Sequence, residues 1–207
     1  EHTLSLLRQE QDLLEEKLKE TRKRKGLIEK RIRALEAAKK VEEGKITFQS
    51  IPERRCVRIE QYITKDEEMD FVIRKLHRKH EDKIQDLTTQ TIGAFLSMED
   101  IRCGIANSYN AVFFVLEDGA DDCDFVLPGG TYATCFYPGC YEQNAEVVRR
   151  MLSDLEEKGV SAIGEPFELY EIDNRDTIRE EEFLTEIQIQ VSGSAGMELT
   201  VLEDTVR

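Results

Sequence analysis

The predicted secondary structure repeats its order within the chain, and this repeat constrains the fold more than any other feature. Each unit contains a strand, an amphipathic helix and two further strands. The first unit covers 54–63, 64–81, 89–97 and 111–117, and the second covers 131–137, 142–158, 165–173 and 183–191. Residues 51–191 are therefore predicted to form an α+β domain with a duplicated β-α-β-β order. We expect the two sheets to pair, the helices to cover the outer side, and a small-molecule groove at the junction.

A long amphipathic helix is predicted before this domain. Residues 4–41 contain no proline and one glycine, and a helix of about 38 residues is about 57 Å long at 1.5 Å per residue. Apolar residues recur at the heptad positions Leu4, Leu7, Leu14, Leu18, Ile28, Ile32 and Leu35, with an interruption at Thr21 and Lys25. Because this stripe is too long to pack on a small domain, residues 1–43 are predicted to form a coiled coil that makes the chain a homodimer. The central TRKRK sequence either sets the register of the pairing or is simply solvated.

The charge is unevenly distributed. Residues 1–43 carry 12 lysines and arginines against 10 acids, whereas residues 44–207 carry 17 against 33. An acidic domain repels a phosphate backbone and attracts cations, so the domain of residues 44–191 is not expected to bind nucleic acid itself. Residues 192–207, which include SGSAG, are predicted to be a flexible tail.

The cysteines and the hydropathy indicate the compartment. Five cysteines contain no CxxC pair, which favours ordinary packing in a reducing, cytoplasmic compartment over a disulfide or a zinc site. No segment approaches the roughly 18 apolar residues of a membrane span, so no membrane association is expected. His77 and His80 lack a third ligand, so we expect neither a metal nor another cofactor. Because the chain starts at Glu1 within the helical pattern, it is expected to be a piece of a longer protein.

Acidic and aromatic residues alternate on the predicted strands of the second unit. Successive strand residues face opposite sides of a sheet, so Glu168, Tyr170 and Ile172 are predicted to share one face. Glu186 lies on the last strand with two glutamines at alternate positions, although one of these two strand faces is also compatible with plain solvent. A buried carboxylate among aromatic rings attracts a lipophilic cation by Coulomb and cation–π interactions. We therefore predict a cation receptor at these acids, and Tyr137 is a further candidate among the strand aromatics.

Catalysis is not indicated by any known motif. The sequence contains no GxSxG, no glycine-rich phosphate loop and no HExxH. The same carboxylate, with its pKa raised by burial, would also serve as a general acid or base beside a tyrosine. Sequence alone separates these two uses poorly.

Several segments resemble the effector-binding part of drug-sensing MerR-family transcription regulators, which is a GyrI-like domain. They are LPGGTYA at 127–133, GEPFELYEID at 164–173, EEFLTEIQIQV at 181–191 and NSYNAVF at 107–113. The pattern F-x-S-I-P-x-R-x-x-x-R-I that follows the long helix is also similar to these regulators. The resemblance covers nearly all of residues 1–191, as a diffuse pattern in a consistent order.

The resemblance implies particular site residues. The glutamate of PFEL is Glu168, which would meet a cationic drug, and the tyrosine of NSYNAVF is Tyr109, which would line the pocket. The aromatic residue before the last strand is Phe183, and Glu186 is the acid of T-E-I-x-I, which is typical of the family. In such regulators a winged helix-turn-helix precedes the coiled coil, so DNA binding would belong to a segment that these 207 residues do not contain.

We therefore expect the dimerisation helix and ligand-sensing domain of a MerR-like regulator, and not an enzyme. Two other classes remain open. Some GyrI-like domains resemble hydrolases of strained electrophiles, for which Glu186 or Glu168 with Tyr109 would be the catalytic pair, although a small hydrolase has no need of a long dimer helix. The third class is a module that binds and inhibits a partner protein.

Overall fold

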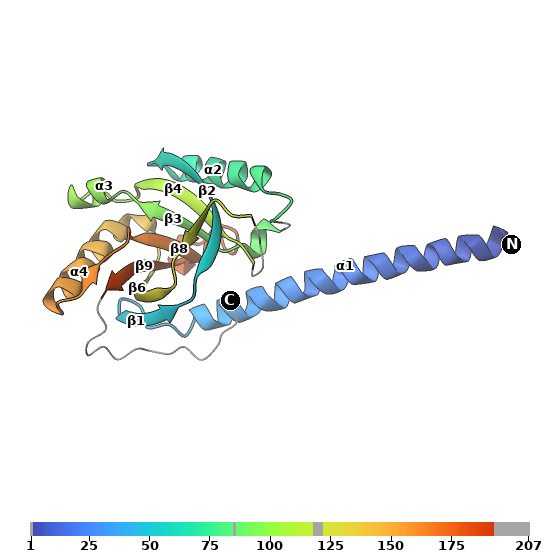
Figure 1. The fold of residues 1–207 in the computed structure, drawn as a ribbon, viewed down its shortest axis with the longest axis horizontal. Helices are drawn as coiled ribbons and strands as arrows, with labels where there is room; N and C mark the ends of the chain where they lie inside the picture. Colours follow the sequence, from blue (N-terminus) through green and yellow to red (C-terminus); the bar gives the residue numbers. More distant parts are fainter. Residues whose placement is uncertain (1, 85, 118–121, 193–207) are drawn as a thin grey trace.

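The computed structural model describes residues 2–84, 86–117 and 122–192 (Figure 1). Four α-helices are present in these ranges: α1 (His2–Ala38), α2 (Asp66–Lys79), α3 (Met98–Arg102) and α4 (Asn144–Glu157). The strands are β1 (Ile46–Ile51), β2 (Arg54–Ile63), β3 (Ile92–Leu96), β4 (Tyr109–Val115), β5 (Phe125–Leu127), β6 (Gly130–Pro138), β7 (Ser161–Ala162), β8 (Phe167–Ile172) and β9 (Leu184–Ser192). Every predicted strand is present, whereas the short elements α3, β5 and β7 were not predicted. Of the predicted tail, residues 193–207 lie outside the described residues.

The duplicated β-α-β-β order is confirmed. The first unit is β2-α2-β3-β4 and the second is β6-α4-β8-β9, and the hydrogen-bonded order of the sheet is β1-β6-β9-β8-β3-β4-β2-β5. The second strands of the two units, β3 and β8, pair directly and antiparallel, with Ala94 opposite Glu168. The sheet is therefore continuous across the junction. The groove expected there cannot be a gap between the units, because backbone hydrogen bonds close that gap.

Helices cover one face of the sheet. The register places Val112 of β4, Ala94 of β3 and Ile187 of β9 on this helix-covered face. These side chains form one buried cluster with Leu76 of α2 and Val148 of α4. The cluster buries the apolar stripes of both amphipathic helices, which is the main source of their stability.

The opposite face, called here the curled face, lies inside a bend of the sheet. β1 and β2 lie near opposite ends of the hydrogen-bonded order, yet only Pro52 and Glu53 separate them. The three consecutive Cα–Cα distances from Ile51 to Arg54 span at most about 11 Å. The sheet therefore has to curl until its two ends approach each other. A second buried cluster fills this curl, consisting of Ile51, Cys56, Phe113, Leu127, Tyr132, Phe167 and Leu169.

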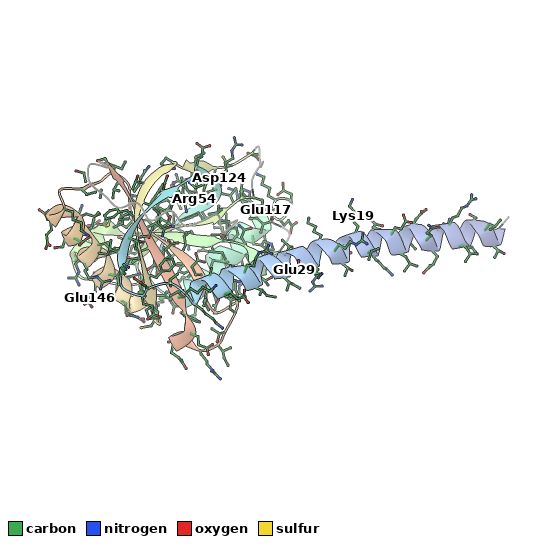
Figure 2. All side chains as sticks on the ribbon, turned by 90° about the horizontal axis from the view of Figure 1, so that it is seen from below. Lys19, Glu29, Arg54, Glu117, Asp124 and Glu146 are labelled. Carbon is green, nitrogen blue, oxygen red and sulfur yellow. The ribbon has the colours of Figure 1, made fainter. Side chains whose placement is uncertain are left out.

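Helix α1 leaves the domain as a single long rod (Figure 1). Figure 2 shows Lys19 on the part that extends away from the domain, and Glu29 where the helix approaches it. Only the C-terminal part contacts the domain, near β8 and the short 3-10 helix η1 (Leu87–Thr89). Most residues of the predicted seam are about half exposed in the single chain, including Leu4, Leu7, Leu14, Leu18, Ile28 and Ile32. Among the described residues, no helix combines the length and apolarity needed to cross a membrane.

A β-bulge changes one sequence prediction. Tyr170 pairs with Thr185 and Ile172 pairs with Leu184, so Glu171 is the extra residue on β8. The extra residue interrupts the alternation of the strand. Ile172 therefore does not share a face with Glu168 and Tyr170, and the prediction that it does was wrong.

Candidate functional site

Glu168 lies at the centre of the sheet, next to the junction of the two units. Its neighbours across the strands are Ala94 and Ile187, so it projects from the helix-covered face. The residue is 0% exposed. A carboxylate in such a position needs hydrogen-bond donors or a counter-charge, because removal from water is costly.

Phenolic and amide groups surround this carboxylate. The hydroxyl of Tyr137 on β6 donates to Glu168 Oε1 at 2.6 Å. Oε2 accepts no hydrogen bond of normal geometry from the described residues, although Tyr109, Tyr170 and Asn144 lie close enough to favour the charged form of Glu168. We call these five residues the Glu168 cluster.

The protonation of the cluster follows from its burial. Burial raises the pKa of Glu168 to about 7, and the hydrogen bond from Tyr137, together with the nearby polar groups of Tyr109, Asn144 and Tyr170, opposes this rise. Burial also holds the pKa of each of the three phenols well above its ordinary value, with the nearby Glu168 as the next cause. The tyrosines therefore stay neutral donors at physiological pH, while Glu168 changes charge near neutrality.

Asn144 is a member of the cluster that sequence reasoning missed. It is the first residue of α4 and is 0% exposed. Its amide nitrogen donates to the Tyr109 hydroxyl at 3.3 Å, and its amide oxygen accepts from the backbone nitrogen of Asn107 at 3.1 Å. An asparagine at the start of a predicted amphipathic helix was the available signal, but it is equally typical of a helix cap.

Two further aromatic rings extend the cluster. Tyr141 contacts the ring of Tyr170 edge-on, with a centroid distance of 5.4 Å, and stacks on Phe183 at 5.7 Å. Both rings lie where the chain enters a strand or helix, since Phe183 precedes β9 and Tyr141 precedes α4. Tyr141 thus connects Phe183 to Tyr170, and through it to the other predicted residues of the cluster.

Glu186 lies elsewhere. It is also 0% exposed, but its neighbours across the strands are Leu169 and Phe136, so it projects from the curled face. Glu186 is the residue before Ile187, and Ile187 pairs with Glu168 across the strands. Because adjacent residues of a strand point to opposite faces, the two carboxylates lie on opposite sides of the sheet. The six predicted site residues therefore do not form one site.

The surroundings of Glu186 have a different chemistry. Gln188, two residues further on the same face, is 0% exposed and has no hydrogen-bond partner in the described part of the chain. The guanidinium of Arg54 lies over the rings of Tyr132 and Phe167, at 5.3 and 5.5 Å from their centroids. This face already holds a protein cation against its aromatic rings, whereas no cation–π contact among the described residues involves a tyrosine of the Glu168 cluster.

The Glu168 cluster can therefore do one of two things chemically. An ionised carboxylate among aromatic rings stabilises a bound cation. A carboxyl group that titrates near neutrality beside neutral phenols transfers protons. No three His, Cys, Asp or Glu side chains within the described ranges are arranged to hold a metal ion.

Comparison with known proteins assigns the domain to a family. A sequence profile described as a GyrI-like small molecule binding domain matches residues 44–192. No curated protein matches the chain in sequence.

Three solved structures illustrate the likeness in fold. The crystal structure of the EcmrR C-terminal domain has 18% identity and a TM-score of 0.57, over 72% of this chain and 98% of that one. EcmrR in a cryo-EM complex with DNA has 17% identity and a TM-score of 0.57, over 86% and 69%. A hydrolase from Listeria innocua has 14% identity and a TM-score of 0.50, over 76% and 96%. At these identities the likeness concerns the fold alone.

Proposed function

The chain belongs to the GyrI-like small-molecule-binding family, and from this premise we propose that its domain binds lipophilic cations at the Glu168 cluster. The domain would then be the ligand-sensing part of a MerR-like transcription regulator. The observation that carries the proposal is the enclosure of Glu168, at 0% exposure, beside the polar groups of Tyr137, Tyr109 and Tyr170.

The physical argument concerns what such a carboxylate gains from a ligand. The described residues supply Glu168 with neutral donors, which compensate a buried negative charge less completely than a counter-ion does. A lipophilic cation supplies that counter-charge, and it contacts aromatic faces at the same time. The net charge of the chain, −14, attracts cations to the domain before they bind.

The test is a titration with a fluorescent quaternary ammonium dye at pH 8. Glu168→Gln should weaken binding by about 1–3 kcal/mol, roughly five- to 150-fold, because the variant keeps the shape but loses the charge. Glu186→Gln is the matched control, since that carboxylate is equally buried and projects from the opposite face. The dye should bind this control as it binds the wild type.

The pH dependence gives a second reading of the same experiment. Because the dye carries a fixed charge, its affinity should rise as Glu168 ionises, steeply below pH 7 and little above pH 8. A Glu168→Gln variant that retains both the affinity and this pH profile would contradict the proposal. A loss confined to Glu186→Gln would move the site to the curled face.

The regulatory setting is part of the proposal. The half-exposed leucines of α1, such as Leu7 and Leu14, supply a seam for a second copy of the chain. EcmrR, whose fold is similar, has been seen in complex with DNA. In the protein proposed here, paired α1 helices join two ligand domains, and DNA binding belongs to a winged helix-turn-helix of the whole protein. The free thiols of all five cysteines suit a cytoplasmic setting.

Hydrolysis of a reactive small molecule is the second candidate. It is favoured by the pKa of Glu168, which at about 7 suits a general acid or base, and by the nearby hydroxyl of Tyr137. The discriminating experiment incubates the protein with a strained aryl epoxide and follows ring opening. Turnover that Glu168→Gln abolishes would support an enzyme, whereas dye binding without turnover would support the sensor.

A further inference from the structure

Arg31 joins α1 to the ligand domain. Its Nε donates to Asp176 Oδ1 at 3.1 Å, and its Nη2 donates both to Asp176 Oδ2 and to the backbone oxygen of Glu171, the latter at 2.9 Å. The side chains of Arg31 and Asp176 are only 17% and 13% exposed. A bidentate pair with this burial fixes geometry more firmly than an exposed surface pair does. We call this set of contacts the Arg31 clamp.

The loop that carries Asp176 is held from several sides. The backbone nitrogen of Asp173 donates to Asp176 Oδ2 at 3.3 Å, and Asp173 pairs with Arg175 at 2.7 Å. Arg175 also donates to the backbone oxygens of Leu87 and Gln90, at 2.9 and 2.7 Å. Because the loop is braced against the segment after α2, it cannot easily absorb a displacement of β8, and the displacement reaches Arg31.

The second contact of the Arg31 clamp, with the backbone of Glu171, lies next to the Glu168 cluster. Glu171 is the extra residue of the bulge on β8 and follows Tyr170 directly. A bulge takes its extra residue out of the regular ladder, and here the carbonyl of that residue accepts from Arg31. One peptide unit therefore separates the α1 contact from Tyr170, a member of the cluster.

We propose that the Arg31 clamp couples the Glu168 cluster to the direction in which α1 leaves the domain. This inference rests on the proposed function, because it assigns the regulation of that site. Glu168 is fully enclosed while the clamp is closed. In this proposal Tyr170 moves to admit the cation, and this movement carries the adjacent Glu171 carbonyl away from Arg31. The clamp thus opposes binding, and binding loosens the attachment of α1.

Arg31→Met tests both directions of this linkage. Since coupling free energies are reciprocal, the variant should bind the quaternary ammonium dye more tightly than the wild type, by about five- to tenfold. In the wild type, the dye should increase amide hydrogen exchange in residues 27–38. In Arg31→Met this segment should exchange fast already and respond little to the dye.

Arg33→Met is the matched control, because Arg33 is exposed on the same helix and carries the same charge. It should behave like the wild type in both measurements. Equal dye affinities for wild type and Arg31→Met, or the same exchange response in both, would overturn the coupling. The coupling would also be overturned if Arg33→Met increased the affinity for the dye as much as Arg31→Met does. The loss of one positive charge would then explain the increase in both variants.

A measurement without dye separates the two proposals. Arg31→Met removes a guanidinium and Tyr170→Phe removes a hydroxyl, and these two groups do not touch each other in the contacts described. Their effects on the unfolding equilibrium constant should therefore multiply if the sites are independent. The coupling predicts that the effects do not multiply. If the two effects on the unfolding equilibrium constant multiply, the proposed coupling through the Arg31 clamp is overturned, whatever the dye measurements give. If they do not multiply but the wild type binds no dye, only the proposal of a cationic ligand is contradicted.

Discussion

At the residue scale, Glu168 shows how burial and hydrogen bonding compete over one charge. Desolvation is the larger effect and raises the pKa to about 7, while the Tyr137 hydroxyl and its neighbours favour the charged form. A group whose folded-state pKa lies above its unfolded value binds its proton more tightly in the folded protein. Its ionisation therefore destabilises the fold, and the penalty depends on pH.

Glu168→Gln should reveal this penalty. Below about pH 4.5 the carboxyl is protonated in both states, so the penalty is absent; it grows as the pH rises and is complete above pH 7. Relative to the variant, the wild type should lose up to about 3 kcal/mol of unfolding free energy between pH 4.5 and pH 8. Urea unfolding at both pH values measures this difference. Glu146→Gln, at an exposed position of α4, is measured alongside as the control for the substitution itself.

At the element scale, the pairing of β3 with β8 holds the two units together, and a glycine permits it. A Cβ on Gly93 would lie 2.3 Å from Cζ of Phe113 and 2.5 Å from the backbone oxygen of Glu168. Real Cβ atoms do not approach other atoms so closely. The missing side chain lets the Phe113 ring lie against the sheet, where it packs edge-on against Phe167 at a centroid distance of 5.6 Å.

Gly93→Ala should therefore destabilise the domain by about 1–3 kcal/mol, because the backbone oxygen cannot swing aside as a flexible side chain would. Thermal unfolding followed by circular dichroism measures the change. Gly26→Ala is the control: a Cβ there meets nothing within 4 Å, and alanine favours a helix by about 0.5–1 kcal/mol. A neutral Gly93→Ala would mean that the junction is looser than the contacts of Gly93 indicate.

At the scale of the whole molecule, the long helix and the acidic domain differ in how much apolar surface they bury. The domain has its own core, formed by the two clusters on either side of the sheet. Helix α1 buries little of its apolar seam against that core, since residues such as Leu14 and Ile28 remain about half exposed. An apolar seam of this length needs a partner helix.

Leu14→Asn should weaken self-association at least tenfold, because it places a polar group in the N-terminal apolar part of the predicted seam. Leu13→Asn is a matched control on the neighbouring helix position, since Leu13 is 52% and Leu14 is 55% exposed but only Leu14 belongs to the heptad series. Sedimentation equilibrium measures both. Equal losses would show that the heptad assignment does not describe the interface.

The sequence was sufficient to predict most of the fold, because its patterns are local. The strand 54–63 was predicted with the bounds that β2 has. The duplicated order followed from hydrophobic periodicity and from helix ends, both of which act over a few residues. The carboxylate of Glu168 and its companion Tyr170 were likewise recognised from alternation on a single strand.

Other features depend on contacts between distant segments, and only the folded chain could decide them. One such feature is the face of the sheet on which each acid lies. Glu168 and Glu186 are on different strands, and the register of β8 against β9 puts them on opposite sides of the sheet. Asn144 enters the cluster because the first residue of α4 lies beside Tyr109, the first residue of β4. Arg31 meets Glu171 across 140 positions of sequence. Local patterns cannot encode such pairs, because each residue is an ordinary member of its own element and gains its role from the element packed against it.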